Sequence, residues 1–240
     1  MAAAATLAGM LATPFTRRGG AGRRLLSSVE VSGLCSATVA ASVRRWGPAR
    51  AAGAAGTTML LTSAIERVGI VTGRPFGSYR YTPALQPQIA GVPVLVPMAW
   101  AGMAVPARET AHAALGERSN PATRMVVGAA TLTAWDLFLD PQMVAEGYWR
   151  WARRGIYRGI PFSNYSGWFV TGLGVMALLE IVLPPTEPVP ELVAEYGTMA
   201  VMETAGFATF FGDRVVAAAG AAAMLPVAVV ATVRLVGQRM

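Results

Sequence analysis

Long apolar blocks constrain the fold of this chain more than any other feature. Six of them are evident, at 49–65, 89–105, 125–135, 167–183, 197–211 and 215–233. A helix of about 20 mostly apolar residues spans a hydrocarbon core about 30 Å thick. A soluble domain rarely needs six such stretches, so the sequence predicts a polytopic membrane protein.

The charge pattern agrees with this interpretation. Charged residues make up 14% of the chain, against about 25% in typical soluble domains. The net charge of +7 is carried by 20 basic residues. All of them are arginines, and they fall mainly between the apolar blocks, as expected of loops beside anionic lipid headgroups. No basic stripe typical of a nucleic-acid-binding surface is evident, so no nucleic acid is expected as a partner.

Seven helical segments can be delimited from the pattern. The fold class expected is therefore all-α, a polytopic integral membrane bundle of about seven transmembrane helices within a single domain over 23–240. Residues 1–22 place their arginines after the apolar run, unlike a signal peptide, and are expected to form a disordered basic tail. The predicted helices are 25–43, 49–68, 89–106, 122–140, 166–183, 196–211 and 214–236.

Familiar catalytic motifs are missing. Cys35 and His112 are the single cysteine and histidine of the chain, which excludes an internal disulfide and a cysteine zinc site. G-x-S-x-G, P-loop, HExxH and CxxC patterns do not occur, so hydrolase triads, ATPases and thiol redox chemistry have no starting point. No metal and no cofactor is expected.

Two segments between helices, 73–93 and 146–168, are rich in glycine, proline and aromatic residues. A membrane interface commonly carries tryptophan and tyrosine, but that explains one or two of them rather than the whole set. The set favours a binding site whose backbone is fixed by turns. Its members are Tyr79, Tyr81, Tyr148, Trp149, Trp151, Tyr157, Tyr165 and Trp168.

Acidic residues within apolar segments are costly and usually face a protein interior. Asp136 and Asp140 are four residues apart and share one helical face. Their mutual repulsion and burial would keep one carboxyl group protonated near neutral pH. A structural alternative is that Asp140 ends the helix before Pro141 while Asp136 pairs with an arginine. The other acids within or beside apolar segments are Glu30, Glu66, Glu180 and Glu203.

The D-x-x-x-D spacing also allows a magnesium site of the kind found in membrane prenyltransferases. Such enzymes hold a diphosphate between two acidic clusters, because each magnesium ion bridges carboxylate and phosphate oxygens. Only one cluster is present here, which weakens this interpretation.

Four ordered blocks resemble the membrane-bound carotenoid biosynthesis family that includes the CruF-type carotenoid hydratases. They are "GRPFGSYRYTPAL" (73–85), "GVPVLVPMAW" (91–100), "WDLFLDPQMVAEGYWRW" (135–151) and "YRGIPFSNYSGW" (157–168). The resemblance spans about 66–168. It implies an enzyme that adds water across the terminal isoprenoid double bond of a carotenoid end, gives a tertiary alcohol and needs no redox cofactor.

The residues fit that chemistry. Hydration of a trisubstituted alkene needs an acid, a means of stabilising the cation and a positioned water. Asp136 and Asp140 are the candidate acid and water-orienting pair, and Glu66 is the next candidate acid. Aromatic faces stabilise cations. The residues expected to bind substrate, cation or water are Trp135, Tyr148, Trp149, Tyr157, Asn164, Trp168, Tyr79 and Tyr81.

Two alternatives stay open at this point. The same acid could let the cation close into a ring, as in a lycopene cyclase, or the protein could bind carotenoid without turnover. In each case the expected partners are a carotenoid and the lipid bilayer, together with other carotenoid biosynthesis enzymes, and the expected location is the bacterial plasma membrane.

Overall fold

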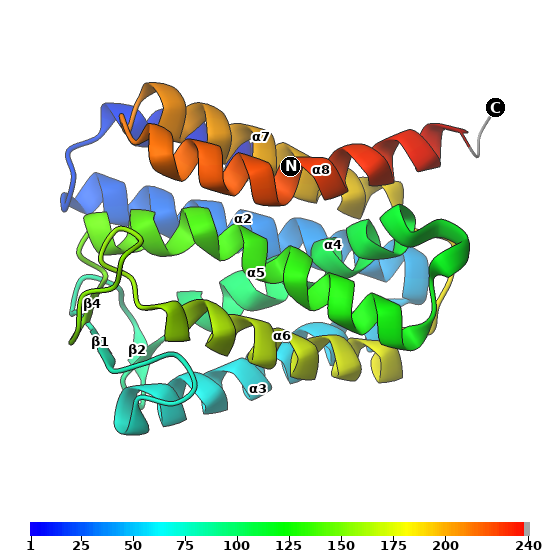
Figure 1. Ribbon diagram of the computed structural model, residues 1–240, viewed down its shortest axis with the longest axis horizontal. Helices are drawn as coiled ribbons and strands as arrows, with labels where there is room; N and C mark the ends of the chain where they lie inside the picture. The colour runs from blue at the N-terminus through cyan, green and yellow to red at the C-terminus, as the bar shows by residue number, and fades with distance from the viewer. Residues whose placement is uncertain (238–240) are drawn as a thin grey trace.

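The protein is a bundle of long helices that run side by side, as the computed structural model describes for residues 1–237 (Figure 1). The first of the eight helices, α1, is short, and each of the other seven overlaps a predicted segment, which confirms the all-α prediction. The helices are α1 (Ala2–Ala12), α2 (Ala21–Trp46), α3 (Pro48–Thr72), α4 (Leu95–Leu115), α5 (Pro121–Ala145), α6 (Phe162–Val182), α7 (Pro190–Thr209) and α8 (Arg214–Gly237).

The N-terminal segment differs from the disordered tail expected of it. Its run of alanine and leucine has high helix propensity and forms α1, followed by a short 3₁₀ turn over Thr13–Phe15. Helix α1 packs along α2, where the Thr6 hydroxyl donates to the backbone oxygen of Glu30 at 3.3 Å. Contact with α2 therefore stabilises a helix in a segment that was expected to be disordered.

Helix α4 is the centre of the bundle. It packs against α2, α3, α5, α6, α7 and α8, and every residue over 99–111 is buried. Pro106 lacks an N–H group, which leaves the carbonyl of Gly102 without its helical donor. The Thr38 hydroxyl on α2 donates to that carbonyl at 2.6 Å, so a neighbouring helix satisfies the gap.

The start of α4 lies later than predicted. Residues 88–93 form a small antiparallel hairpin instead, with strands β2 (Gln88–Ile89) and β3 (Val92–Pro93). The turn residues Ala90 and Gly91 both have positive φ angles, 50° and 83°, which a helix does not admit. The chain becomes helical only at Leu95.

Helix α5 continues through Pro141 to Ala145. Asp140 is therefore inside the helix, and the expectation that it ends the helix is wrong. Pro141 cannot donate to the carbonyl of Leu137, and the Tyr157 hydroxyl donates to it at 2.9 Å instead. A tyrosine from the following loop thus compensates for the proline.

Two short strands close one end of the bundle. Strand β1 (Tyr79–Tyr81) follows α3, and β4 (Trp149–Trp151) follows α5. They pair antiparallel and lie at the left end of the helices in Figure 1. The pairing brings together the two aromatic segments that the sequence separates.

Three of the described helices, α2, α6 and α8, are long and apolar enough to cross a membrane by length and composition. Helices α3, α4, α5 and α7 do not meet the same criterion. The expected number of about seven transmembrane helices is therefore larger than hydropathy alone supports.

Candidate active site

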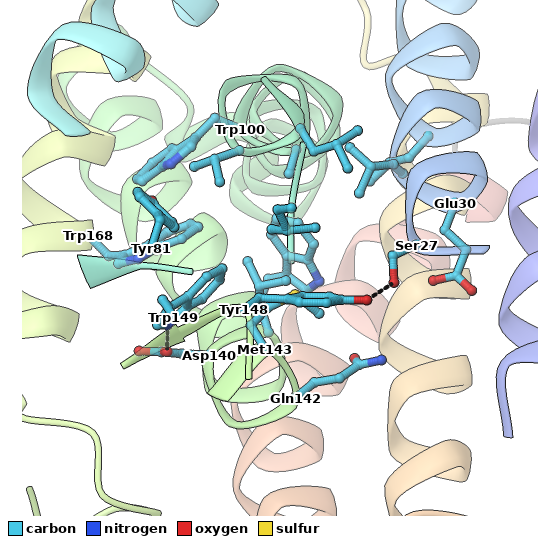
Figure 2. A pocket seen from close by; sticks show the side chains of 18 of the residues that line it. Ser27, Glu30, Tyr81, Trp100, Asp140, Gln142, Met143, Tyr148, Trp149 and Trp168 are labelled. Atoms are coloured by element: carbon cyan, nitrogen blue, oxygen red, sulfur yellow. Dashed lines mark hydrogen bonds between the residues drawn. The ribbon is translucent and has the colours of Figure 1, made fainter. Parts of the chain in front are cut away.

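A cavity opens among α2–α7 at the end of the bundle that carries β1 and β4. The space among its lining atoms is about 990 Å³, a volume that includes space open to the surroundings. Figure 2 shows the side chains that line it. Those predicted from the sequence are Glu66, Tyr79, Tyr81, Trp135, Asp140, Tyr148, Trp149, Asn164 and Trp168.

The register of β1 and β4 explains why four aromatic side chains meet there. Residues two apart on a strand share a face, so Tyr79 and Tyr81 point to the same side. Tyr79 lies opposite Trp151, and Tyr81 lies opposite Trp149. The ring centroids of these pairs are 5.1 and 5.8 Å apart, within the range of favourable aromatic contact. These four residues form what is called the aromatic wall below.

One strand of the aromatic wall donates to Glu66 on α3. The hydroxyls of Tyr79 and Tyr81 both donate to Glu66 Oε2, the latter at 2.7 Å. Burial raises the pKa of both tyrosines above the ordinary value, and the neighbouring Glu66 raises it further. Both phenols therefore keep their protons and act as donors. Gly69 makes this approach possible, since a Cβ there would lie 2.9 Å from the Tyr79 hydroxyl.

The other strand of the wall donates to Asp140 on α5. Trp149 Nε1 and Trp151 Nε1 lie 2.5 and 3.4 Å from Asp140 Oδ1. Asn164 Nδ2 on α6 donates to Oδ2 at 2.8 Å. Asp140 is only 1% exposed, and these N–H groups replace the water that a carboxyl group loses on burial.

Asn164 joins Asp140 to Asp136. Its Nδ2 also donates to Asp136 Oδ2, at 2.6 Å, so one amide nitrogen bridges two carboxyl groups. Asp136 is fully buried, and no group within residues 1–237 donates to its other oxygen, Oδ1. Its hydrogen-bond partner is an amide, so the structural alternative in which Asp136 pairs with an arginine is wrong. Two buried carboxyl groups this close disfavour full ionisation, and the pair is suited to holding a proton.

Three tryptophans that lie on helices also line the cavity. Trp100 on α4 and Trp168 on α6 are stacked, with centroids 3.9 Å apart. Trp135 on α5 meets Trp168 edge to face at 6.3 Å. The Trp100 ring also donates from Nε1 to Glu66 Oε1 at 3.3 Å. Aromatic surface and acidic oxygens are thus within the same small volume.

Of the two tyrosines Tyr148 and Tyr157, which the sequence placed in the site, only Tyr148 lines the cavity. Tyr157 does not line this cavity; it lies in a separate apolar groove with Leu137 and Tyr165. Its role there is the hydrogen bond to the carbonyl freed by Pro141. Tyr148 does line the cavity, and its hydroxyl lies 3.0 Å from the Ser27 hydroxyl.

Sequence reasoning did not assign Trp100, Glu30 or Glu203 to the site. Trp100 lies in one of the blocks that carry the family resemblance, so it had a usable signal, and Trp151 was included in the aromatic set but not among the substrate-binding residues. Glu30 and Glu203 were noted as acids in apolar segments, but nothing in the sequence indicated that α2 and α7 bring them to this cavity.

A second buried charged cluster lies apart from the cavity. Arg108 donates to Glu109 at 2.6 Å and to Glu180 at 2.8 Å, and Arg124 donates to Glu180 at 2.5 and 3.0 Å. Each acid there has a cationic partner, so the cluster ties α4, α5 and α6 together. Among the described residues, no three His, Cys, Asp or Glu side chains are placed to hold a metal ion.

Comparison with known proteins connects this site to a family. The model of the family described as carotenoid biosynthesis protein matches residues 28–236. The chain belongs to the carotenoid biosynthesis protein family. The matched segment includes nearly all of α2–α8, and with it the aromatic wall and the Asp136–Asn164–Asp140 bridge.

A curated relative carries a more specific name. The chain is 35% identical over 134 residues to bisanhydrobacterioruberin hydratase of Haloarcula japonica. The aligned part covers 55% of this chain and 45% of the relative, so the chain matches less than half of that protein's length. No solved structure matches the chain.

Proposed function

We propose that this protein is a carotenoid hydratase, which adds water across the terminal double bond of a carotenoid end by acid catalysis to give a tertiary alcohol. The observation that carries the proposal is the Asp136–Asn164–Asp140 bridge, buried beside a cavity lined with aromatic rings. Membership of the carotenoid biosynthesis protein family supplies the substrate class. The hydratase named in the comparison supplies the reaction type.

The proposed location is the bacterial plasma membrane, with α2–α8 all crossing the bilayer. Outward-facing apolar side chains support this, since they occur on helices that fail the hydropathy criterion as well as on those that meet it. Leu60 on α3 is 73% exposed, and Val201 on α7 is 56% exposed. Polar residues on the same helices, such as Thr62 and Glu66 on α3 and Glu203 on α7, are buried within the bundle instead, as expected of polar groups at membrane depth. A carotenoid could then enter from the lipid.

Proton delivery falls to Asp140. The Asp136–Asp140 pair holds one proton, and Asp140 is the member that lines the cavity. In the first step the O–H bond of the Asp140 carboxyl group breaks and a C–H bond forms at the less substituted alkene carbon. The alkene π electrons make that bond and leave a cation at the tertiary carbon. General acid catalysis of this kind contributes about 10²–10⁴-fold to a rate.

The tertiary cation lies among the tryptophan rings. A desolvated cation within about 6 Å of an aromatic ring gains about 2 kcal/mol or more, and Trp100, Trp149 and Trp168 supply such rings. Three donors hold the Glu66 carboxyl group beside these rings, where a cation at the tertiary carbon favours its ionised form and Glu66 supplies the countercharge. Water then forms the C–O bond and loses its proton to the carboxylate that began the reaction. The acid is regenerated, and the net change is the addition of one water.

Pigment analysis in a lycopene-producing bacterium tests the proposal. Expression of the wild-type protein is expected to yield pigment heavier by water, with an absorption maximum that shows no new conjugated double bond. Asp140→Asn is expected to remove this product. Asp213→Asn is the matched control, because Asp213 lies outside the cavity and asparagine also caps a helix well. Pigment of unchanged mass would indicate cyclisation, and unaltered pigment that co-purifies would indicate a binding protein.

A further inference from the structure

The cavity has a second acidic end, which the proposed chemistry at Asp140 does not use. Glu30 on α2 and Glu203 on α7 line it there, beside Thr6 of α1. Glu203 is 8% exposed, yet it accepts no hydrogen bond from another group within residues 1–237. A buried carboxyl group without a partner is costly. It therefore points to an O–H or N–H donor that is supplied from outside the chain.

The Glu30 side chain is already partly engaged. Its Oε1 accepts a hydrogen bond from the Thr13 hydroxyl at 2.5 Å. This contact ties the glutamate to the turn after α1 and fixes one oxygen. It leaves Glu203 as the acid at this end whose carboxyl oxygens are open to a ligand.

Polar groups also lie between this end and Asp140. Tyr148 and Ser27 form a hydroxyl pair at 3.0 Å, and Gln142 lines the same cavity. In the view of Figure 2, all three lie between Asp140 and Glu30. The remaining lining there is apolar, such as Val31, Leu34 and Met143. The polar groups thus form a discontinuous row through an otherwise apolar part of the cavity.

Hydration consumes one water in every turnover, and an apolar cavity holds water only where it offers several polar partners. We propose that Glu203, with Glu30, holds the water that the reaction consumes and passes it along the Tyr148–Ser27 pair and Gln142 toward Asp140. This inference rests on the proposed function. Glu203 is a positioning residue in it, since it acts through water and does not touch the reacting carbons.

Water capture competes with proton loss from the cation. If water attacks more slowly than the cation loses a proton, the proton goes to the carboxylate and an alkene forms, either the original or an isomer. In D₂O the acid carries deuterium, so whenever the cation loses a proton in place of the added deuteron, deuterium stays in pigment that has gained no oxygen. The ratio of deuterated unhydrated pigment to alcohol therefore reports water supply, whatever the overall rate.

The test compares Glu203→Leu with Glu203→Gln in membrane vesicles suspended in D₂O and supplied with an acyclic carotenoid. Glutamine keeps an acceptor, whereas leucine removes it and suits an apolar surrounding, so both variants are expected to insert. Loss of one hydrogen bond to a neutral acceptor changes a rate about fivefold. We expect the ratio of deuterated unhydrated pigment to alcohol to rise by that factor in the leucine variant and to stay near the wild-type value in the glutamine variant.

An unchanged ratio in Glu203→Leu, with alcohol still formed by the wild type, would overturn the inference and leave the hydratase proposal standing. A weaker apparent affinity for pigment at an unchanged ratio would also overturn it, since that result assigns Glu203 to the substrate. Absence of alcohol from the wild type would refute the hydratase proposal, and the water site with it.

Discussion

Two buried acidic clusters in this bundle are built in opposite ways. Around Arg108 and Arg124 each acid faces a guanidinium group, at distances of 2.5 to 2.8 Å in the ion pairs. Around Asp140 and Glu66 the donors are neutral, namely indole and amide groups at Asp140 and phenol and indole groups at Glu66. The first arrangement cancels charge and fixes helices, whereas the second leaves acidic groups that can exchange a proton.

The two clusters lie at opposite ends of the same helices. Arg124 and Asp140 are sixteen residues apart on α5, and so are Asn164 and Glu180 on α6. At a rise of 1.5 Å per residue, either span measures about 24 Å. Neutralised charge at one end can thus stabilise the bundle while the proposed catalytic acids occupy the other, and variants at the two ends should have separable effects.

Asp140→Asn should show the largest effect on activity. Loss of the acid is expected to lower the hydration rate by about 10²–10⁴-fold. Asparagine keeps the shape and an acceptor for the two tryptophans, but its Nδ2 replaces the oxygen that accepts from Asn164, so a modest loss of stability is also expected. Alcohol formation per milligram of folded protein is the measurement. Activity within a few-fold of wild type would remove Asp140 from the mechanism.

Arg108→Met should show the largest effect on stability. It leaves Glu109 with an uncompensated buried charge and Glu180 with Arg124 as its remaining cationic partner. Removal of one partner from such a buried cluster costs about 3–5 kcal/mol. Arg158→Met is the matched control, because the Arg158–Asp213 pair is 42% and 27% exposed and such pairs contribute about 0–1 kcal/mol. Denaturant unfolding in detergent measures both. Equal losses would show that the Arg108 cluster is no more structural than a surface ion pair.

Trp168→Leu should have a smaller effect, and on activity rather than stability alone. Removal of the ring stacked on Trp100 takes away about 2 kcal/mol of cation stabilisation, or about thirtyfold in rate. Trp46→Leu provides a control for the loss of a buried indole, because Trp46 donates to the carbonyl of Pro184 outside the cavity. Comparable rates for the two variants would argue against a role of the ring in the reaction.

Tyr81→Phe is expected to have the mildest effect. It removes one of the donors to Glu66, which corresponds to about 1 kcal/mol and a several-fold loss of rate. Tyr196→Phe removes a buried hydroxyl that donates to the Thr131 carbonyl at 2.8 Å and should leave the rate unchanged. A rate loss confined to Tyr81→Phe would support Glu66 as the countercharge.

Helix positions were accessible from the sequence because apolar blocks and breaker residues are local signals. The exceptions have identifiable causes. Ala90 and Gly91 turn the chain where hydropathy suggested a helix, and α1 depends on contact with α2. Pro141 suggested a helix end, but Tyr157 donates to the freed carbonyl and the helix continues.

The site was only partly accessible. The i, i+4 spacing correctly put Asp136 and Asp140 on one helix, and most of the aromatic residues named do line the cavity. The pairing of Tyr81 with Trp149 and the link from Glu66 to Trp100 join segments far apart in the chain. Such contacts follow from strand register and helix packing, which no single segment encodes. Tyr157 illustrates the converse. Its place in an aromatic segment suggested that it belongs to the site, but its hydroxyl donates to a carbonyl of α5 outside the cavity.

Transfer of oxygen from water is the most direct test of the central claim. Purified protein would be incubated with an acyclic carotenoid in oxygen-labelled water, and the mass of the pigment would be measured by mass spectrometry. The hydratase interpretation predicts a tertiary alcohol that carries the labelled oxygen with wild-type protein and none with Asp140→Asn. Product of unchanged mass, or an alcohol whose oxygen is unlabelled, would contradict it.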